Sequence, residues 1–219
     1  MHKTVKNLLD IEDNIKVNLN KLNLNNYPKI IAVSKTFKIN KILPLIENGH
    51  IDFGENKVQE ALEKWTEIKK INSKIRLHMV GKLQTNKVKF AVQIFDYIHS
   101  VDSEKLARKI ADEQNKMNKK IKIFLQVNIG DESQKSGINK NEVGKLVSFC
   151  EEIGLNVIGL MCIPPVNSDP EGYFVEMNKL NKDLGLVELS MGMSSDYLIA
   201  AKNFSTYVRV GSSIFGQRF

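Results

Sequence analysis

Residues 29–36 read KIIAVSKT, an apolar stretch of β type that ends on a single lysine, Lys35, between Ser34 and Thr36. It is the first of eight short apolar runs: IIAVS, IDFGE, LHMVG, YIHSV, IFLQVNI, VIGLMCI, VELSMGM and YVRVG. Amphipathic stretches separate these runs along the whole chain. Short apolar runs that alternate with amphipathic segments are typical of repeated βα units.

The segments between the runs have helical periodicity. Residues 4–23 place apolar side chains at helical spacing, and a break follows at residues 25–28, which read NNYP. Further segments with this periodicity, often opened by a helix-capping residue, begin near Asn56, Asn86, Ser103, Asn139, Asp169 and Ser195. Eight strands with crossover helices predict a (β/α)₈ TIM barrel with an added N-terminal helix, and a doubly wound open sheet is the alternative.

Length and composition predict one domain over residues 1–219. The chain is 42% hydrophobic, which suffices for a substantial core, and its 5 prolines do not gather in a linker. The amino terminus lacks the apolar core of a signal peptide, and no apolar stretch approaches the roughly 18 residues of a membrane span. We therefore expect a cytoplasmic protein that does not enter a membrane. Cys150 and Cys162 are expected to be buried thiols.

The formal net charge of +7 raises the question of nucleic-acid binding. The lysines are scattered, however, as in the pairs at 69–70 and 119–120, and clustered arginines, interleaved aromatic residues and nucleic-acid-binding motifs are absent from the sequence. The pattern favours a solvated lysine-rich surface and no nucleic-acid partner. A basic field of this kind also attracts phosphorylated ligands.

The candidate site residues all follow, or lie near the end of, a predicted strand. In a barrel of this class, functional groups lie at the carboxyl ends of the strands, and phosphate often binds after the seventh and eighth. The seventh run ends in SMGMSSD and the eighth reads VRVGSSIFG, and each can turn backbone N–H groups toward an anion. The candidates are Lys35, Asn56, Ser194, Arg209, Gly211 and Ser212.

A lysine amine that is held neutral can attack a carbonyl, and an adjacent pair of anion-binding turns can hold a phosphate. Pyridoxal 5′-phosphate requires both features, because its aldehyde bonds to a lysine while its phosphate is anchored elsewhere. The sequence has a candidate for each. No metal site is expected, since the cysteines do not have the spacing of metal ligands.

Seven strings, taken in order, resemble the pyridoxal-phosphate homeostasis protein family over nearly the whole chain. They are IIAVSKT, IDFGENKVQEA, HMVGKLQTNK, QVNIGDESQKSGI, GLMCIP, SMGMSSD and VRVGSSIFG. The resemblance implies a fold similar to the barrel domain of alanine racemase, with pyridoxal 5′-phosphate as the cofactor. One departure is Lys82 in the third string, where a smaller or apolar residue is expected; we expect it to face solvent.

Residue by residue, the resemblance makes Lys35 the Schiff-base lysine. It makes Ser194, Gly211 and Ser212 contacts of the phosphate. It also places Arg209 against the pyridine nitrogen and Asn56 in the lining of the site.

Each candidate also has a purely structural interpretation. Lys135 is the competing lysine, but its polar loop favours a hydrated ammonium in a lid or salt bridge. His78 is expected to be a core histidine whose nitrogens have partners. Ser194 can simply cap a helix, Gly211 can serve barrel closure, and Arg209 can form a salt bridge at the rim.

The function we expect is the binding of pyridoxal 5′-phosphate in its intracellular homeostasis, that is, holding and delivering it without robust turnover. Alanine racemases take a tyrosine from a second domain, and a source for one is not evident here. A guanidinium at the pyridine nitrogen also keeps the ring neutral and a poorer electron sink. The alternatives are a weak pyridoxal-phosphate-dependent amino-acid racemase or similar enzyme and, third, a Schiff-base aldolase. Apo-enzymes that need the cofactor are candidate partners, and a monomer is the default expectation.

Overall fold

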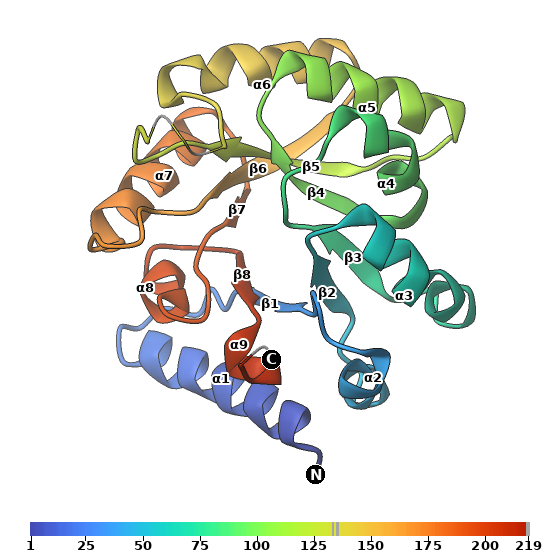
Figure 1. Cartoon of the computed structure of the whole chain (residues 1–219). Helices are drawn as coiled ribbons and strands as arrows, with labels where there is room; N and C mark the ends of the chain where they lie inside the picture. The colour runs from blue at the N-terminus through green and yellow to red at the C-terminus, as the bar shows by residue number, and fades with distance from the viewer. Residues whose placement is uncertain (133, 135, 218–219) are drawn as a thin grey trace.

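The chain forms a closed barrel of eight parallel strands, which confirms the predicted TIM barrel and excludes the open sheet (Figure 1). The structure, a computed structural model, describes residues 1–132, 134 and 136–217. Strand order follows the sequence, and the barrel closes where β8 pairs in parallel with β1. The strands are β1 Lys29–Val33, β2 Asp52–Glu55, β3 Arg76–Met79, β4 Tyr97–Val101, β5 Lys122–Val127, β6 Asn156–Cys162, β7 Glu188–Ser190 and β8 Tyr207–Val210.

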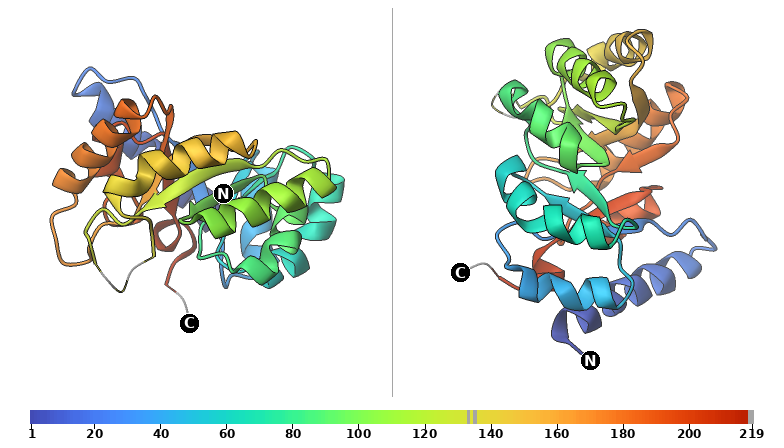
Figure 2. Two further views of the ribbon diagram at one scale, coloured as in Figure 1. Left: turned by 90° about the horizontal axis from the view of Figure 1, so that it is seen from above. Right: turned by 90° about the vertical axis from the view of Figure 1, so that its right-hand side faces the viewer.

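Helices surround the strands on the outside, as the two further views also show (Figure 2). The α-helices are α1 Lys3–Asn20, α2 Ile39–Glu47, α3 Val58–Ile71, α4 Val88–Ile94, α5 Glu104–Lys116, α6 Val143–Glu152, α7 Glu171–Asp183, α8 Tyr197–Lys202 and α9 Ser212–Phe215. Two short 3₁₀ turns, η1 Thr85–Lys87 and η2 Lys140–Glu142, lead into α4 and α6. Among the described residues, no helix combines the length and apolar character needed to cross a membrane.

Of the six helix starts predicted from the sequence, those at Ser103 and Asn139 have a side-chain cap, and the other four do not. The Ser103 hydroxyl accepts a hydrogen bond from the Leu106 N–H at 3.4 Å, at the start of α5. The Asn139 side chain caps η2 in the same way, accepting from the Asn141 N–H at 2.9 Å. The sequence patterns did not predict α2, which contains Pro44. Proline removes one helical N–H and normally argues against a helix, so here the packing of Ile42 and Leu45 outweighs local propensity.

The added N-terminal helix is confirmed as α1, which packs beside α8 and α9 at the seam where β1 meets β8 (Figure 1). Its buried face includes Leu8, Ile15 and Leu19. The Asn7 side chain donates a hydrogen bond to the Ile214 carbonyl at 2.8 Å, so the first helix is tied to the last turn. Burying one such apolar side chain contributes about 1.5–3 kcal/mol.

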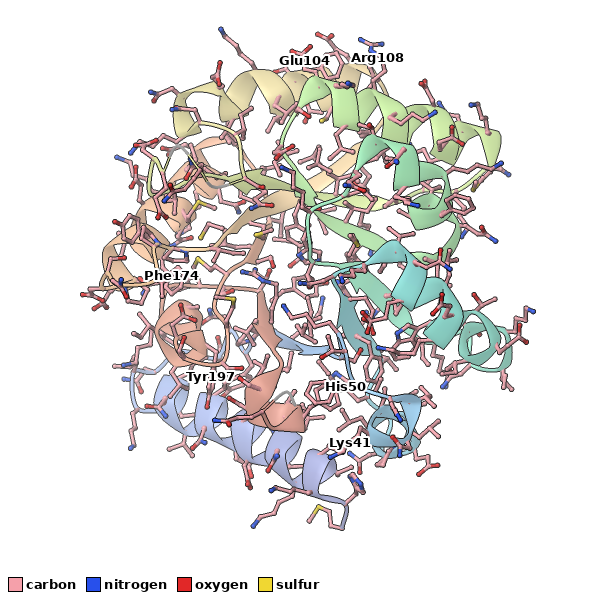
Figure 3. All side chains as sticks on the ribbon, viewed as in Figure 1. Lys41, His50, Glu104, Arg108, Phe174 and Tyr197 are labelled. Carbon is pink, nitrogen blue, oxygen red and sulfur yellow. The ribbon has the colours of Figure 1, made fainter. Side chains whose placement is uncertain are left out.

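Apolar side chains form two layers, one between strands and helices and one inside the barrel. Strand alternation along β8 sends Val208 and Val210 into the outer layer and Tyr207 into the inner one. The inner layer consists of Ile31, Val33, Tyr97, Phe124, Met161 and Tyr207. Charged helix faces point the other way: Glu104 and Arg108 of α5 lie at the outer edge of the molecule, away from the strands (Figure 3).

Candidate functional site

A cavity of about 370 Å³ opens among the carboxyl ends of β1, β2, β3, β6, β7 and β8. Its volume is in the usual range for small-molecule sites. All six candidates from the sequence line it: Lys35, Asn56, Ser194, Arg209, Gly211 and Ser212. Sequence reasoning missed the rest of the lining, Val33, Val80, Ile163, Met193 and Ser195. Four of the missed residues are apolar, and their patterns do not differ from those of core residues.

Lys35 lies in the turn after β1, two residues beyond the last strand residue, Val33, and is half-buried. Helix α3 holds both of its neighbours. The Ser34 carbonyl accepts a hydrogen bond from Lys64 Nζ at 2.9 Å, and the Thr36 N–H donates to Glu60 Oε1 at 2.5 Å. Thr36 has a φ of +68°, a left-handed conformation that few threonines adopt. The turn that presents Lys35 is therefore fixed from outside the barrel.

A buried carboxylate, Glu55 of β2, completes this clamp. Its Oε1 accepts hydrogen bonds from the Ser34 hydroxyl at 2.8 Å, from Lys64 Nζ at 2.9 Å and from Trp65 Nε1 at 3.0 Å. Glu55 is fully buried and the Lys64 side chain is 9% exposed. Buried ion pairs of this kind persist when hydrogen bonds satisfy them, and here they connect β1, β2 and α3.

Asn56 follows β2 and lies against the turn after β3. A Cβ atom at Gly81 would come within 2.6 Å of the Asn56 carbonyl oxygen and 2.8 Å of its Cα. Only glycine permits this approach. The glycine in the VG pair after the third strand therefore serves the placement of Asn56.

The turns after β7 and β8 lie side by side and are joined by Ser194. Its hydroxyl oxygen accepts hydrogen bonds from the N–H groups of Gly211 at 3.3 Å and Ser213 at 3.4 Å. The N–H groups of Ser194, Ser195 and Ser212 form no hydrogen bond within the described residues, and all three residues line the cavity. This arrangement is a ready anion-binding concavity.

Glycine is required at two positions in these turns, for a different reason at each. A Cβ atom at Gly211 would lie 3.2 Å from the Val33 carbonyl oxygen, so this glycine also lets β8 approach β1. Gly192 has a φ of +90°, and a Cβ atom there would lie 2.5 Å from Ala200 Cβ. Gly192 is thus the position in SMGMSSD where backbone conformation and packing both require glycine. Sequence reasoning passed over it, although its place in the string was the available signal.

Arg209 points into the barrel below the cavity. Its Nη1 donates to the Ser190 hydroxyl oxygen at 2.7 Å, and its Nη2 donates to the Cys162 carbonyl at 2.8 Å. The residue is 5% exposed, and burial lowers its pKa, but a guanidinium keeps its charge. In the described part of the chain Arg209 forms no ion pair with a carboxylate. The alternative interpretation, a salt bridge at the barrel rim, therefore finds no support among the described residues. A buried cation with only neutral partners favours a ligand that brings an acceptor.

The remaining sequence predictions concern residues away from the cavity wall. His78 is a core histidine with a partner on each ring nitrogen, as predicted. Lys82 is exposed, also as predicted. The competing lysine, Lys135, lies outside the described residues. Cys150 and Cys162 are buried thiols.

Comparison with known proteins places the chain in a family. The family model described as alanine racemase, N-terminal domain, matches residues 7–218. The pyridoxal phosphate homeostasis protein of Pasteurella multocida is 35% identical over 201 residues, covering 87% of this chain and 86% of the relative. That of Aquifex aeolicus is 35% identical over 203 residues, covering 88% of each chain.

Solved structures give the same relationship. PipY of Synechococcus elongatus, solved both without PLP and with PLP bound, is 32% identical, with TM-scores of 0.83 and 0.81 and coverage of 92% of this chain and 100% of that chain. An alanine racemase of Clostridium difficile shares the fold at 16% identity, with a TM-score of 0.70 over 94% of this chain and 57% of the racemase. The chain therefore belongs to the alanine racemase N-terminal domain family and, within it, to the pyridoxal phosphate homeostasis proteins.

Proposed function

We propose that this protein binds pyridoxal 5′-phosphate covalently through Lys35 and acts in the homeostasis of that cofactor, holding it and delivering it to apo-enzymes. One observation carries the proposal: an amine, a buried guanidinium and three backbone N–H groups without a partner among the described residues line a single cavity. These are the partners that an aldehyde, a pyridine nitrogen and a phosphate need. The relative PipY, solved with PLP bound, supports this choice of ligand.

Lys35 supplies the covalent bond. Its ammonium must first lose a proton; the amine then attacks the aldehyde carbon, a C=N bond forms and one water leaves. The clamp from Lys64 and Glu60 on either side of Lys35 fixes the backbone from which the amine reaches into the cavity. Proximity of this kind replaces a bimolecular encounter by a unimolecular step.

The phosphate lies, in this proposal, against the N–H groups of Ser194, Ser195 and Ser212. Gly211, which the sequence resemblance also makes a phosphate contact, donates its N–H to the Ser194 hydroxyl oxygen and so contributes through the space it leaves. Backbone donors in a concave turn bind anions without the entropy loss of long side chains. Arg209 approaches from the other side. The strand register pairs it with Ile31, four residues before Lys35, so it reaches the cavity from its buried end.

We do not expect robust turnover. Bound pyridoxal phosphate acts as an electron sink, most effectively when its ring nitrogen is protonated. Arg209 can only donate a hydrogen bond, so it favours the unprotonated ring. A saturable amino-acid racemization with kcat/KM of about 10⁴ M⁻¹s⁻¹ or more would instead support the enzyme alternative.

The proposal is tested by adding pyridoxal 5′-phosphate to the purified full chain, recording the absorption spectrum, reducing with borohydride and mapping the adduct by mass spectrometry. We expect a lysine adduct at Lys35 and its loss in Lys35→Ala. Lys82→Ala is the matched control, because Lys82 is exposed beside the mouth, and it should keep the adduct. An adduct on Lys82 or Lys135 in the unaltered protein would refute the assignment.

A further inference from the structure

Behind Arg209, four side chains continue a line of hydrogen bonds through the barrel interior toward its amino-terminal end. Ser190 Oγ lies 2.9 Å from His99 Nδ1. His99 Nε2 lies 3.0 Å from His78 Nδ1, and His78 Nε2 lies 3.0 Å from Asp52 Oδ1. Asp52 is the first residue of β2 and pairs with Arg76 on the opposite side. The line therefore spans from Arg209 at the cavity to an ion pair at the far end.

The chemistry of Arg209 and Asp52 fixes which group donates and which accepts at each end of this line of hydrogen bonds. Arg209 can only donate, so Ser190 Oγ accepts from it, and the ionised Asp52 can only accept. Burial alone would raise the pKa of Asp52, but the hydrogen bonds from His78 and Arg76 outweigh it and the pKa is lowered. Asp52 is therefore a carboxylate at neutral pH.

The two imidazoles between these ends are neutral. Burial lowers the pKa of His78 despite the opposing effect of Asp52, and burial, with the nearby His78 and Arg209, lowers the pKa of His99 well below its usual value. Both histidines are fully buried. Each neutral ring carries one N–H, and the Ser190 hydroxyl carries one O–H.

Three hydrogens thus serve three links, and only one assignment satisfies them all. His78 Nε2–H must donate to Asp52, because the carboxylate cannot donate. His99 Nε2–H must then donate to His78 Nδ1, and the Ser190 O–H must donate to His99 Nδ1. Every hydrogen bond in the line points away from the cavity, and the Ser190 lone pairs are left for Arg209.

Aromatic packing holds the rings in this alignment. His78 stacks on Tyr97, with ring centroids 4.2 Å apart and planes at 15°, and His99 stacks on Phe124 at 4.2 Å and 21°. Tyr207 packs near both histidines from the side. Because protein interiors are close-packed, a flip of either ring would displace its neighbours.

We propose that Ser190, His99 and His78 are positioning residues for Arg209, a role that rests on the proposed function of the cavity. The one-way hydrogen-bond line fixes the Ser190 hydroxyl as an acceptor, and with the Cys162 carbonyl it fixes two nitrogens of the guanidinium. The other N–H groups of Arg209 are thereby aimed at a ring acceptor in the cavity. Without this line of hydrogen bonds, the guanidinium would populate several orientations. Ligand binding would then have to fix one of them, and the lost entropy would weaken the affinity.

The first test needs no cofactor. Long-range ¹H–¹⁵N NMR of the full chain labelled at histidine should show neutral Nε2–H tautomers for both His78 and His99 at pH 7.5. Ser190→Ala should shift the Nδ1 resonance of His99 and leave the exposed His2 unchanged. An Nδ1–H tautomer or an imidazolium at either buried ring would overturn the proposed direction.

The second test measures affinity and absorption maximum by titration with pyridoxal 5′-phosphate. Ser190→Ala should raise Kd about 5- to 20-fold and shift the absorption maximum, while Ser190→Thr, which retains the hydroxyl, should restore both. Ser190→Cys, with a weaker donor and acceptor, serves if the alanine variant does not fold, and should also raise Kd. Ser100→Ala is the matched control, since the buried Ser100 hydroxyl has no partner in the described structure, and it should bind as the unaltered protein does.

The two proposals fail in different ways. Failure of the unaltered protein to bind pyridoxal 5′-phosphate would refute the proposed function and with it the positioning role. Normal binding by the unaltered protein, together with unchanged Kd and spectrum in folded Ser190→Ala or Ser190→Cys, would refute the positioning role alone.

Discussion

Ser194 illustrates, at the scale of a single residue, how one hydroxyl can serve both the shape of the site and its ligand. Its oxygen accepts from the N–H groups of Gly211 and Ser213, so it holds the turn after β8 against the turn after β7. Its own hydroxyl hydrogen and N–H form no hydrogen bond within the described residues, and in the proposed function they donate to the phosphate. Ser194 does not cap α8, the helix that follows it in the sequence, because its oxygen instead accepts from Ser213, in the first turn of α9.

Ser194→Ala is expected to weaken binding of pyridoxal 5′-phosphate by about 0.5–1.5 kcal/mol, or about 2- to 12-fold in Kd, because one hydrogen bond is lost while backbone donors remain. Pyridoxal, which lacks the phosphate, should bind the variant and the unaltered protein equally well. Isothermal titration with both ligands measures this. Ser213→Ala is the control, since it removes only an exposed hydroxyl and keeps the N–H that bonds to Ser194. A loss of pyridoxal affinity as large as that of the phosphate ester would contradict the assignment.

At the scale of elements, the position of Lys35 depends on helix α3 as much as on its own strand. Lys64 of α3 bonds to the Ser34 carbonyl and to the buried Glu55, and Glu60 bonds to the Thr36 N–H. The second oxygen of Glu55, Oε2, is buried without a partner in the described structure. Glu55 therefore relies on Lys64 for its charge balance.

Lys64→Met should destabilise the fold by about 3–5 kcal/mol, because it leaves the Glu55 charge buried and unpaired. Urea unfolding followed by circular dichroism measures the change. The double variant Lys64→Met/Glu55→Gln should recover part of the loss. Lys70→Met on the same helix is the control: its pair with Glu67 is exposed, with side chains 66% and 77% accessible, so the change should be within about 0.5 kcal/mol. If Lys64→Met and Lys70→Met changed the free energy of unfolding equally, the buried pair of Lys64 and Glu55 would not stabilise the fold.

At the scale of the whole molecule, two buried histidines of the barrel interior and the half-buried His50 make stability depend on pH. The pKa values of His78, His99 and His50 are all lowered, in each case first by burial, so these rings are neutral in the folded chain where the unfolded chain protonates them. The unfolded state then binds more protons below about pH 6.5, and stability falls as the pH falls through that range. Asp52 acts in a lower window, because its lowered pKa contributes stability that is lost only below about pH 4.

The free energy of unfolding should therefore decrease between pH 7.5 and pH 5.0, by up to about 1.4 kcal/mol per pH unit below about 6.5 for each ring that stays neutral. Urea titrations at half-unit intervals of pH measure the slope. His99→Gln should have a shallower slope than the unaltered protein, because it removes one ring whose pKa burial lowers. A flat profile over this range would mean that the buried histidines become protonated without unfolding.

The sequence alone predicted the barrel, with an open sheet as the alternative, because eight apolar runs in regular alternation with helical segments leave few ways to bury every run. It also placed Lys35, Asn56, Ser194, Arg209, Gly211 and Ser212 at strand ends, and closure of the barrel necessarily brings those ends together. The sequence did not predict helix α2, because Pro44 lowers the local helix propensity. Packing of the helix against the barrel compensates for that loss.

The support of the site follows only from how the chain packs in three dimensions. The bond between Lys64 and the Ser34 carbonyl depends on how α3 packs behind β1. The contact of His99 with Ser190 joins residues 91 positions apart, on strands that are not neighbours in the sheet. Local propensity and periodicity report which face a side chain takes, but not which side chain it meets across a closed barrel. That pairing depends on strand register and on the closure of the whole sheet.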